Sequence, residues 1–167
     1  MNNKDLITKL KEINACSEAV EFCKDKDLKK AWKKCVRADW LLWFVCAMEI
    51  GTIRERIHVI CDCAATALKY VPKGEDRPKK AIEAARAYAD KPTVENLQLL
   101  NAAGDAAWDA AWDAARAARA AAGDARDARA ARAAAGDAAW DAARAAGDAA
   151  HKKMCRIIRK KISIDKL

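Results

Sequence analysis

The sequence predicts an all-α fold, and two patterns support this prediction. Residues 101–150 use only six residue types, and 28 of the 50 are alanine, the residue with the highest helix propensity. Elsewhere apolar residues recur at helical spacing, with no Asn-Gly hairpin turn and no sustained alternation of apolar and polar residues. We expect an N-terminal bundle of short helices and a long Ala-rich antiparallel helical hairpin, packed on the bundle or projecting from it.

Four short helices are predicted before residue 50, each from its apolar spacing and from a polar residue near its start. The first covers residues 4–13, and Ser17 can cap the second. Asp27 opens the third, and Asp39 is the expected N-cap of an apolar helix over residues 40–48. The apolar positions of the first three helices are Leu6, Ile7, Leu10, Ile13, Ala19, Val20, Cys23, Leu28, Trp32, Cys35 and Val36.

Glycine and proline punctuate the chain after residue 50. Gly51 ends the fourth helix, and Thr52 can cap a fifth that runs to about Tyr70. The apolar positions of this fifth helix are Ile53, Ile57, Ile60, Ala64 and Leu68. After a loop, Pro78 suits the first turn of a helix that ends near residue 90, and Thr93 can cap the next helix.

The remaining sequence predicts a hairpin, because a single helix of this length would be a rod. Residues 94–162 contain no proline, and one straight helix of that length would extend about 100 Å at 1.5 Å per residue. Charged residues surround the helix after Asp124, so we place a turn at Gly123 with Asp124 as the next N-cap. We therefore expect a bundle over residues 1–92 and an Ala-rich hairpin with a basic tail over residues 93–167.

The net charge of +8 is concentrated at the C-terminus. Residues 151–167 hold seven Lys and Arg against one Asp, a net charge of +6, whereas residues 1–150 sum to +2. A nucleic-acid-binding protein usually spreads basic charge over one face of its fold. In this sequence only the C-terminal tail fits that description.

Cysteine usage and hydropathy predict a cytoplasmic protein. The seven cysteines are an odd number, the N-terminus starts polar without an apolar signal-peptide region, and the longest apolar run is too short to span a bilayer. We expect most thiols to be buried and unreactive, packing as small apolar groups. The thiols in question are Cys16, Cys23, Cys35, Cys46, Cys61 and Cys155, and the tryptophans expected in the core are Trp32, Trp40 and Trp43.

A candidate binding face lies in the Ala-rich half. Trp108, Trp112 and Trp140 border stripes of Asp and Arg with only alanine behind them. Trp and Arg are enriched at binding hot spots, and Trp also stacks on nucleobases. The charged members of this face are Asp109, Asp113, Arg116, Arg119 and Arg144. Two simpler interpretations stay open, namely rings that fill space that alanine leaves empty, and a solvated charged face.

No catalytic or metal-binding pattern stands out in the sequence. His58 and Cys61 share a helical face that Cys63 does not share, and no second ligand pair completes a tetrahedron. There is no glycine-rich phosphate loop, no Ser-based motif and no carboxylate pair in an apolar setting. An ice-binding helix would need regularly spaced threonine, which residues 94–162 lack. We therefore expect a non-enzymatic protein without a metal or cofactor.

Four segments share a pattern with a known family: residues 15–22, 31–35, 37–43 and 78–89. The most specific is Arg-Ala-Asp-Trp-Leu-Leu-Trp at residues 37–43, with Ala38 where the family is expected to have glycine. On these residues the chain resembles the immunity-five-like family, all-helical immunity proteins of bacteria and phages, over roughly residues 14–150. The resemblance implies neutralisation of a toxin and carries over no catalytic residue.

Together these patterns predict a binding protein that neutralises a partner protein, a toxin or a defence effector, as an immunity or phage counter-defence factor. The alternative is sequestration of a phosphorylated nucleotide, or nucleic-acid binding. In that case the three tryptophans of the candidate face would stack on bases, and its arginines or the basic tail would meet phosphates. No membrane association is expected, and an oligomer through the Ala-rich helices is left open.

Overall fold

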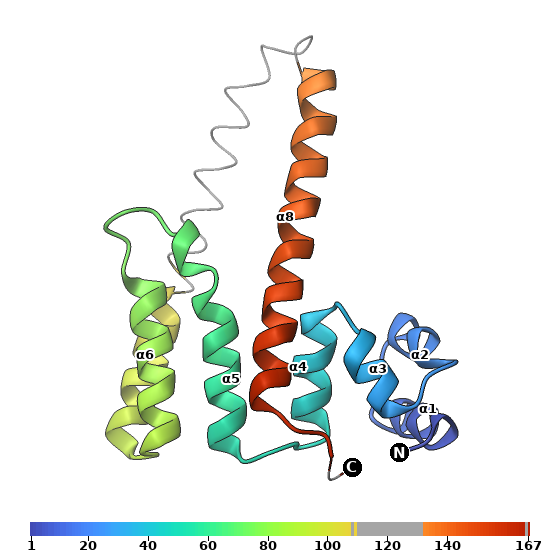
Figure 1. Ribbon diagram of the computed structural model, residues 1–167. Coiled ribbons are helices and arrows are strands. Elements are labelled where there is room, and N and C mark those ends of the chain that lie inside the picture. Colours follow the sequence, from blue (N-terminus) through green and yellow to red (C-terminus); the bar gives the residue numbers. More distant parts are fainter. Residues whose placement is uncertain (108, 110–131, 166) are drawn as a thin grey trace. The chain divides into compact units, whose positions relative to one another are not determined.

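The computed structural model describes residues 1–107, 109, 132–165 and 167, with the backbone alone for residues 132–146 (Figure 1). All regular secondary structure in this part of the chain is helical, which confirms the all-α prediction. Residue contacts group the chain into two units, namely unit 1 (residues 1–60 and 150–167) and unit 2 (residues 61–149). The turn predicted at Gly123 and Asp124, and with it the hairpin, lies outside the described residues.

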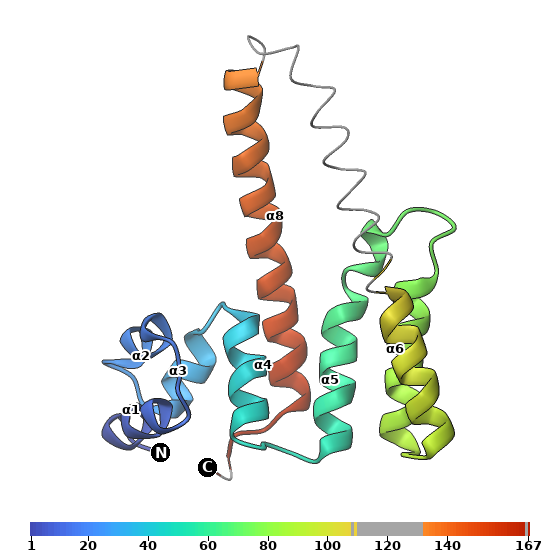
Figure 2. The same cartoon turned by 180° about the vertical axis from the view of Figure 1, so that it is seen from behind.

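Unit 1 is built from both ends of the sequence. Its first helices are α1 (Asn3–Glu12), α2 (Ser17–Cys23), α3 (Leu28–Lys34) and α4 (Ala38–Ala47). It also contains the first part of α5 (Ile53–Ala65) and the last turns of α8 (Arg132–Lys161). Within unit 1 the C-terminal turns of α8 run beside α4, as the front and back views both show (Figures 1 and 2).

The apolar side of the basic tail forms part of the core of unit 1. Cys155, Ile158 and Ile162 recur at helical spacing on α8 and are only 1%, 0% and 4% exposed. The other buried apolar residues of unit 1 are Leu6, Leu10, Ala19, Cys23, Leu28, Ala31, Trp32, Cys35, Ala38, Leu41, Phe44, Val45, Ile50, Val59 and Ile164. The tail is therefore an amphipathic element, with its lysines on the exposed side.

Arg159 joins α8 to the end of α3. Its guanidinium donates to the carbonyl oxygen of Trp32 from Nε at 2.8 Å and from Nη2 at 2.6 Å, and it also donates to the carbonyl oxygen of Cys35. The last carbonyls of a helix have no donor within that helix. A side chain more than one hundred positions away in the sequence therefore satisfies acceptors at the C-terminal end of α3.

His151 plays a similar part at the start of α4. The N–H of Ala38 donates to His151 Nδ1 at 3.2 Å, while the N-cap residue Arg37 makes no side-chain capping bond. The prediction that Asp39 caps this helix was wrong, because α4 already begins at Ala38 and Asp39 lies in its first turn. The cap comes instead from α8, which local sequence spacing could not indicate.

Other helix ends follow the predicted residues. Asp27 Oδ1 accepts from the N–H of Lys30 at 2.7 Å. Thr52 Oγ1 accepts from the N–H of Glu55 at 3.1 Å, and the Glu55 carboxylate accepts in return from the N–H of Thr52 at 2.7 Å, which completes a capping box. Ser17, by contrast, is the first residue of α2 and not its cap, which is Cys16.

The break before α5 depends on a glycine. Gly51 has a φ of +76°, and a Cβ atom at this position would lie 3.0 Å from the Glu55 carboxylate that completes the capping box. α5 itself ends at Ala65, and residues 68–70 form the separate 3₁₀ turn η1 (Leu68–Tyr70). The prediction of one helix to residue 70 was therefore wrong at its C-terminal end.

The buried side of α5 also differs from the predicted one. Ile53 and Ile60 are 68% and 42% exposed, whereas Val59 is 1% exposed and Cys61 and Cys63 are each 3% exposed. The helix carries apolar residues on more than one side, so the spacing of the isoleucines does not by itself show which side is buried. Val59 and Cys63 share one side of the helix and Cys61 lies on nearly the opposite side, so the buried residues of α5 belong to more than one side.

Unit 2 continues with α6 (Arg77–Asp90), which has proline in its first turn as predicted. Arg86 Nη2 donates to Asp62 Oδ1 at 2.6 Å, which ties α6 to the second part of α5. The next helical stretch, residues 94–107, starts with Thr93 Oγ1 accepting from the N–H of Asn96 at 3.2 Å. The Asn96 amide donates back to the carbonyl of Ala87 at 3.3 Å, so this stretch lies beside α6.

Candidate functional site

The α4 helix carries an aromatic face that sequence analysis placed in the core. The helix is apolar along almost its whole length, so its inward side does not hold all of its large residues. Phe44 is buried, Trp40 is half-buried and Trp43 is 38% exposed. The prediction of a core tryptophan was thus wrong for Trp43, and it is confirmed for Trp32, which is 8% exposed.

A ring from α2 extends this face. The centroids of Phe22 and Trp40 lie 5.9 Å apart with the ring planes inclined at 57°, a tilted arrangement that aromatic pairs favour. Trp43 follows Trp40 by three positions, which places the two indoles on the same side of α4. We call Phe22, Trp40 and Trp43 the aromatic surface.

Two cations stack on this surface. Lys26 Nζ lies 4.7 Å from the centroid of Phe22, and Arg37 Cζ lies 4.7 Å from the centroid of Trp40. Asp39 holds the Arg37 guanidinium through two bonds, Nε to Oδ1 at 2.9 Å and Nη2 to Oδ2 at 2.6 Å. The hydrogen bond from Arg37 holds the pKa of the Asp39 carboxyl below its usual range, so this carboxylate stays charged at neutral pH.

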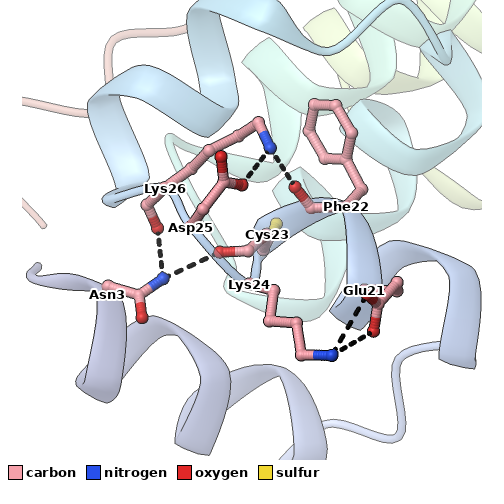
Figure 3. A network of polar contacts seen from close by, with 7 residues as sticks. All are labelled: Asn3, Glu21, Phe22, Cys23, Lys24, Asp25 and Lys26. Atoms are coloured by element: carbon pink, nitrogen blue, oxygen red, sulfur yellow. Dashed lines mark hydrogen bonds and ion pairs between the residues drawn. The ribbon is translucent and has the colours of Figure 1, made fainter.

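A polar network fixes the position of Lys26 (Figure 3). The Asn3 amide, at the start of α1, donates to the carbonyl oxygens of Cys23 at 2.8 Å and Lys26 at 2.7 Å. Lys26 Nζ in turn donates to the carbonyl oxygen of Phe22 at 2.7 Å and to the carboxylate of Asp25. These bonds clamp the turn after α2 against α1, so the cation over Phe22 is preorganised.

An open apolar cavity lies behind the aromatic surface and has a volume of about 50 Å³. Helices α1, α2, α3 and α4 all contribute to its wall. The lining residues are Leu6, Leu10, Ala19, Phe22, Cys23, Leu28, Ala31, Trp32, Cys35, Trp40, Leu41, Trp43 and Phe44. The three rings of the aromatic surface therefore form part of the wall of this open cavity.

Most of the binding face predicted in the Ala-rich half lies outside the described residues: Trp108, Trp112, Asp113, Arg116 and Arg119. Trp140 and Arg144 occupy backbone positions of α8 whose side chains the structure does not describe. Asp109 is helical and exposed. Those residues stay a prediction, and the surface that the structure does describe, on α2 and α4, was missed.

Among the described residues, no group of three or more His, Cys, Asp or Glu side chains is arranged to hold a metal ion. His58 lines an open hollow of unit 1 together with Arg54, Glu55 and Lys161. Cys61 is buried in unit 2, where its thiol donates to the carbonyl oxygen of Ile82 at 3.8 Å.

The thiols fall into two classes. Cys23, Cys35, Cys61, Cys63 and Cys155 are buried, but Cys16 and Cys46 are exposed, so the prediction of burial was wrong for these two. Cys16 is the N-cap residue of α2, and Cys46 lies in the last turn of α4 on the side away from the buried residues of that helix. Burial raises the pKa of the thiols at positions 23, 35 and 61, and it raises the pKa of Cys155 to about 11. These buried thiols are protonated and poorly nucleophilic at neutral pH.

Comparison with known proteins identifies no relative of this chain. No family model, curated protein or solved structure matches the chain. In the described part of the chain, no helix combines the length and the apolar character that crossing a membrane requires.

Proposed function

We propose that this chain is a non-enzymatic binding protein that neutralises a partner protein, as a toxin-immunity or phage counter-defence factor. The observation that supports this proposal most directly is the aromatic surface of Phe22, Trp40 and Trp43, with two stacked cations at an open apolar cavity. Aromatic and arginine side chains around a desolvated pocket are typical of binding hot spots. The immunity role itself is supported by the sequence resemblance, whose most specific segment contains both indoles of this surface.

The proposal includes the cellular compartment in which the protein acts. We place the encounter with the partner in the cytoplasm, where thiols stay reduced. The exposed Cys16 and Cys46 and the high pKa of buried Cys155 are consistent with a protein that uses its cysteines as thiols.

A capture experiment tests the proposed function. The immobilised full-length chain is exposed to lysate of its native host and to products of neighbouring genes, and captured proteins are identified by mass spectrometry. A Trp43→Ala variant should lose the partner, because it removes the exposed ring of the aromatic surface. Tyr70→Ala is the matched control, since Tyr70 is also an exposed aromatic residue (67%) but lies in unit 2. Equal capture by both variants would contradict a role of this surface.

A second candidate function, binding of a phosphorylated nucleotide or a nucleic acid, is favoured by one observation. Unit 1 holds 19 Lys and Arg against 10 Asp and Glu, a net charge of +9, whereas unit 2 sums to −1. Such a concentration of positive charge attracts polyanions. Thermal shift with cyclic nucleotides and with oligonucleotides, at two salt concentrations, tests this candidate. Absence of a shift at low salt would remove it.

A further inference from the structure

The imidazole of His151 accepts a hydrogen bond that only a neutral ring can accept. The N–H of Ala38 donates to Nδ1 at 3.2 Å, so in this arrangement the ring proton is on Nε2. A protonated imidazole carries a proton on both nitrogens and accepts no hydrogen bond. Since histidine is the side chain that ordinarily changes its charge under mildly acidic conditions, the cap on Ala38 depends on pH.

The N–H of Ala38 has little to replace this acceptor. It belongs to the first turn of α4, where N–H groups have no partner within their own helix, and the N-cap residue Arg37 supplies no side-chain acceptor. Ala38 is 0% exposed, so water has no ready access to it. A buried N–H without an acceptor is costly. Protonation of His151 therefore weakens the start of α4.

A partner for the protonated ring lies beside the same nitrogen. Asp39 Oδ1 is 3.7 Å from His151 Nδ1. The hydrogen bond from Arg37 holds the pKa of the Asp39 carboxyl below its usual range, so this carboxylate is charged in mild acid as well. The side chain of His151 is 33% exposed, which lets the ring take a proton from solvent. A small movement of the ring changes it from an acceptor for Ala38 into a donor to Asp39.

The charges around the ring come from two elements. At the start of α4 they are the carboxylate of Asp39 and the guanidinium of Arg37 that it binds. On α8 the exposed Asp148 precedes the ring by three positions, the exposed Lys152 follows it directly, and Cys155 lies four positions later. The Cys155 thiol is neutral, because burial raises its pKa to about 11. Asp39 is therefore the carboxylate within reach of Nδ1.

A change at Asp39 reaches the aromatic surface through Arg37. Arg37 Nε donates to Asp39 Oδ1 at 2.9 Å, which is the oxygen that a protonated His151 also approaches. The same guanidinium stacks on Trp40, with 4.7 Å between Cζ and the ring centroid. A second cation at Oδ1 competes with Arg37 for this oxygen. The arginine over the indole is then held less firmly.

We propose that His151 is a pH-sensitive cap that couples the start of α4 to the aromatic surface. In its neutral form it holds the N–H of Ala38 and leaves Asp39 to Arg37. In its protonated form it releases Ala38, turns to Asp39 and loosens the stack of Arg37 on Trp40. This device goes beyond the proposed function, and it operates in the chain without a partner.

Nuclear magnetic resonance of the isotopically labelled full-length chain tests the proposal between about pH 8 and pH 5. The chain has only two histidines, His58 and His151, so single variants assign the two ring signals. As the His151 ring takes up its proton, the amide proton signal of Ala38 should move upfield, because the amide loses its acceptor. The indole N–H signal of Trp40 should move with the same midpoint.

Replacements of the imidazole separate the roles of its two nitrogens. The side-chain oxygen of His151→Asn can occupy the position of Nδ1 and takes up no proton in this range, so the Ala38 and Trp40 signals should stay constant. His151→Gln places its amide nearer the position of Nε2 and should lose the cap at every pH. Circular dichroism checks that both variants keep their helices. His58→Asn is the matched control and should leave the response of Ala38 intact.

Asp39→Asn tests the second half of the coupling. Ala38 should still respond to the His151 ring in this variant, because its acceptor is still lost on protonation. Trp40 should no longer follow, because the charge that attracts the protonated ring is gone. A Trp40 response of unchanged size in Asp39→Asn would overturn the route to the aromatic surface.

Three further outcomes would overturn the cap itself. The first is a His151 ring that does not titrate in this range. The second is an Ala38 amide that stays constant while the ring titrates. The third is a response of Ala38 that persists in His151→Asn, which would assign it to another group.

Discussion

Unit 1 and the described part of unit 2 are both helical, but they bury their side chains very differently. Among the described residues, every buried apolar side chain except Cys61 and Cys63 belongs to unit 1. The α6 helix of unit 2 has no buried residue at all. Helix formation and core formation are therefore separate properties of this chain. Alanine, lysine and glutamate are sufficient for the first, whereas the second requires larger apolar residues.

The two units also divide the charge between them. The basic character of the chain as a whole, +8, comes entirely from unit 1, because unit 2 is close to neutral. The same unit holds the core, the cavity and the aromatic surface. A mutation in unit 1 should therefore affect stability and binding together, while a mutation in the described part of unit 2 should have small and local effects.

The largest expected difference between the units comes from deleting apolar side chains. Ile158→Ala removes a side chain with 0% exposure and should lower the free energy of unfolding by about 2–5 kcal/mol. Leu99→Ala, in unit 2, removes a side chain that is 60% exposed and should change it by less than about 0.5 kcal/mol. Urea denaturation followed by circular dichroism measures both. Similar losses in the two variants would contradict the contrast drawn between the units.

Alkaline pH should destabilise unit 1 through Cys155. Burial raises the pKa of this thiol from 9.0 to about 11, so above pH 9 the unfolded chain releases the proton while the folded chain retains it. This contribution to stability is complete below pH 9 and is lost as pH rises toward 11, by roughly 2–3 kcal/mol. Urea unfolding across that range measures it. Cys155→Ala should make the profile less steep, because the thiols of Cys23, Cys35 and Cys61 still contribute, and Cys16→Ala, at an exposed thiol, should leave it unchanged.

Loss of the bridge between α8 and α3 should have an intermediate effect. Arg159→Met keeps the aliphatic stem but removes the donors to the carbonyls of Trp32 and Cys35, which should cost about 1–3 kcal/mol. Lys160→Met is the control, because this neighbouring side chain is exposed. Thermal unfolding of the two variants gives the comparison. A melting temperature for Arg159→Met equal to that of Lys160→Met would mean that water replaces the guanidinium as hydrogen-bond donor without any loss of stability.

The smallest expected effect is a local one in unit 2. Thr93→Ala removes the acceptor for the N–H of Asn96 and should cost about 1 kcal/mol at the start of the helical stretch over residues 94–107. Hydrogen exchange should show faster exchange there and no change in unit 1. Ser17→Ala is the matched control, since Ser17 Oγ bonds only to Glu18 and does not cap α2. Protection lost throughout the chain would show that the two units unfold together.

Local signals in the sequence predicted local structure well. Asp27, Thr52, Thr93 and Pro78 each act at a helix end as predicted, because capping depends on neighbours within a few residues. The prediction that Gly51 ends the fourth helix was wrong, since α4 ends at Ala47 and Glu49 takes the left-handed conformation after it. The capping of α4 by His151 and the bridge from Arg159 were not predictable in this way. Both depend on which distant helix packs beside which, and periodicity carries no information about that.

The aromatic surface was missed for a related reason. Trp40 and Trp43 sit in an apolar run, and such a run predicts burial without showing which side has a neighbour. Arg37 and Lys26 stack on rings of this surface, but a cation near an aromatic residue in the sequence is not a sufficient signal, because Trp32 is followed by Lys33 and Lys34 and is only 8% exposed. On α5 the same ambiguity assigned Ile53 and Ile60 to the wrong side.

The two separate pieces of unit 1 have a consequence for how this chain tolerates changes in length. Residues 61–149 join those pieces, so for unit 1 they form a connecting loop of 89 residues. The entropy of closing a flexible loop grows only with the logarithm of its length, and doubling it costs only about 0.6 kcal/mol. The ten-residue segment at 102–111 recurs unchanged at 134–143. Duplication or deletion within this Ala-rich stretch is therefore an inexpensive change for unit 1, and the length of the insertion can vary while the core and the aromatic surface persist.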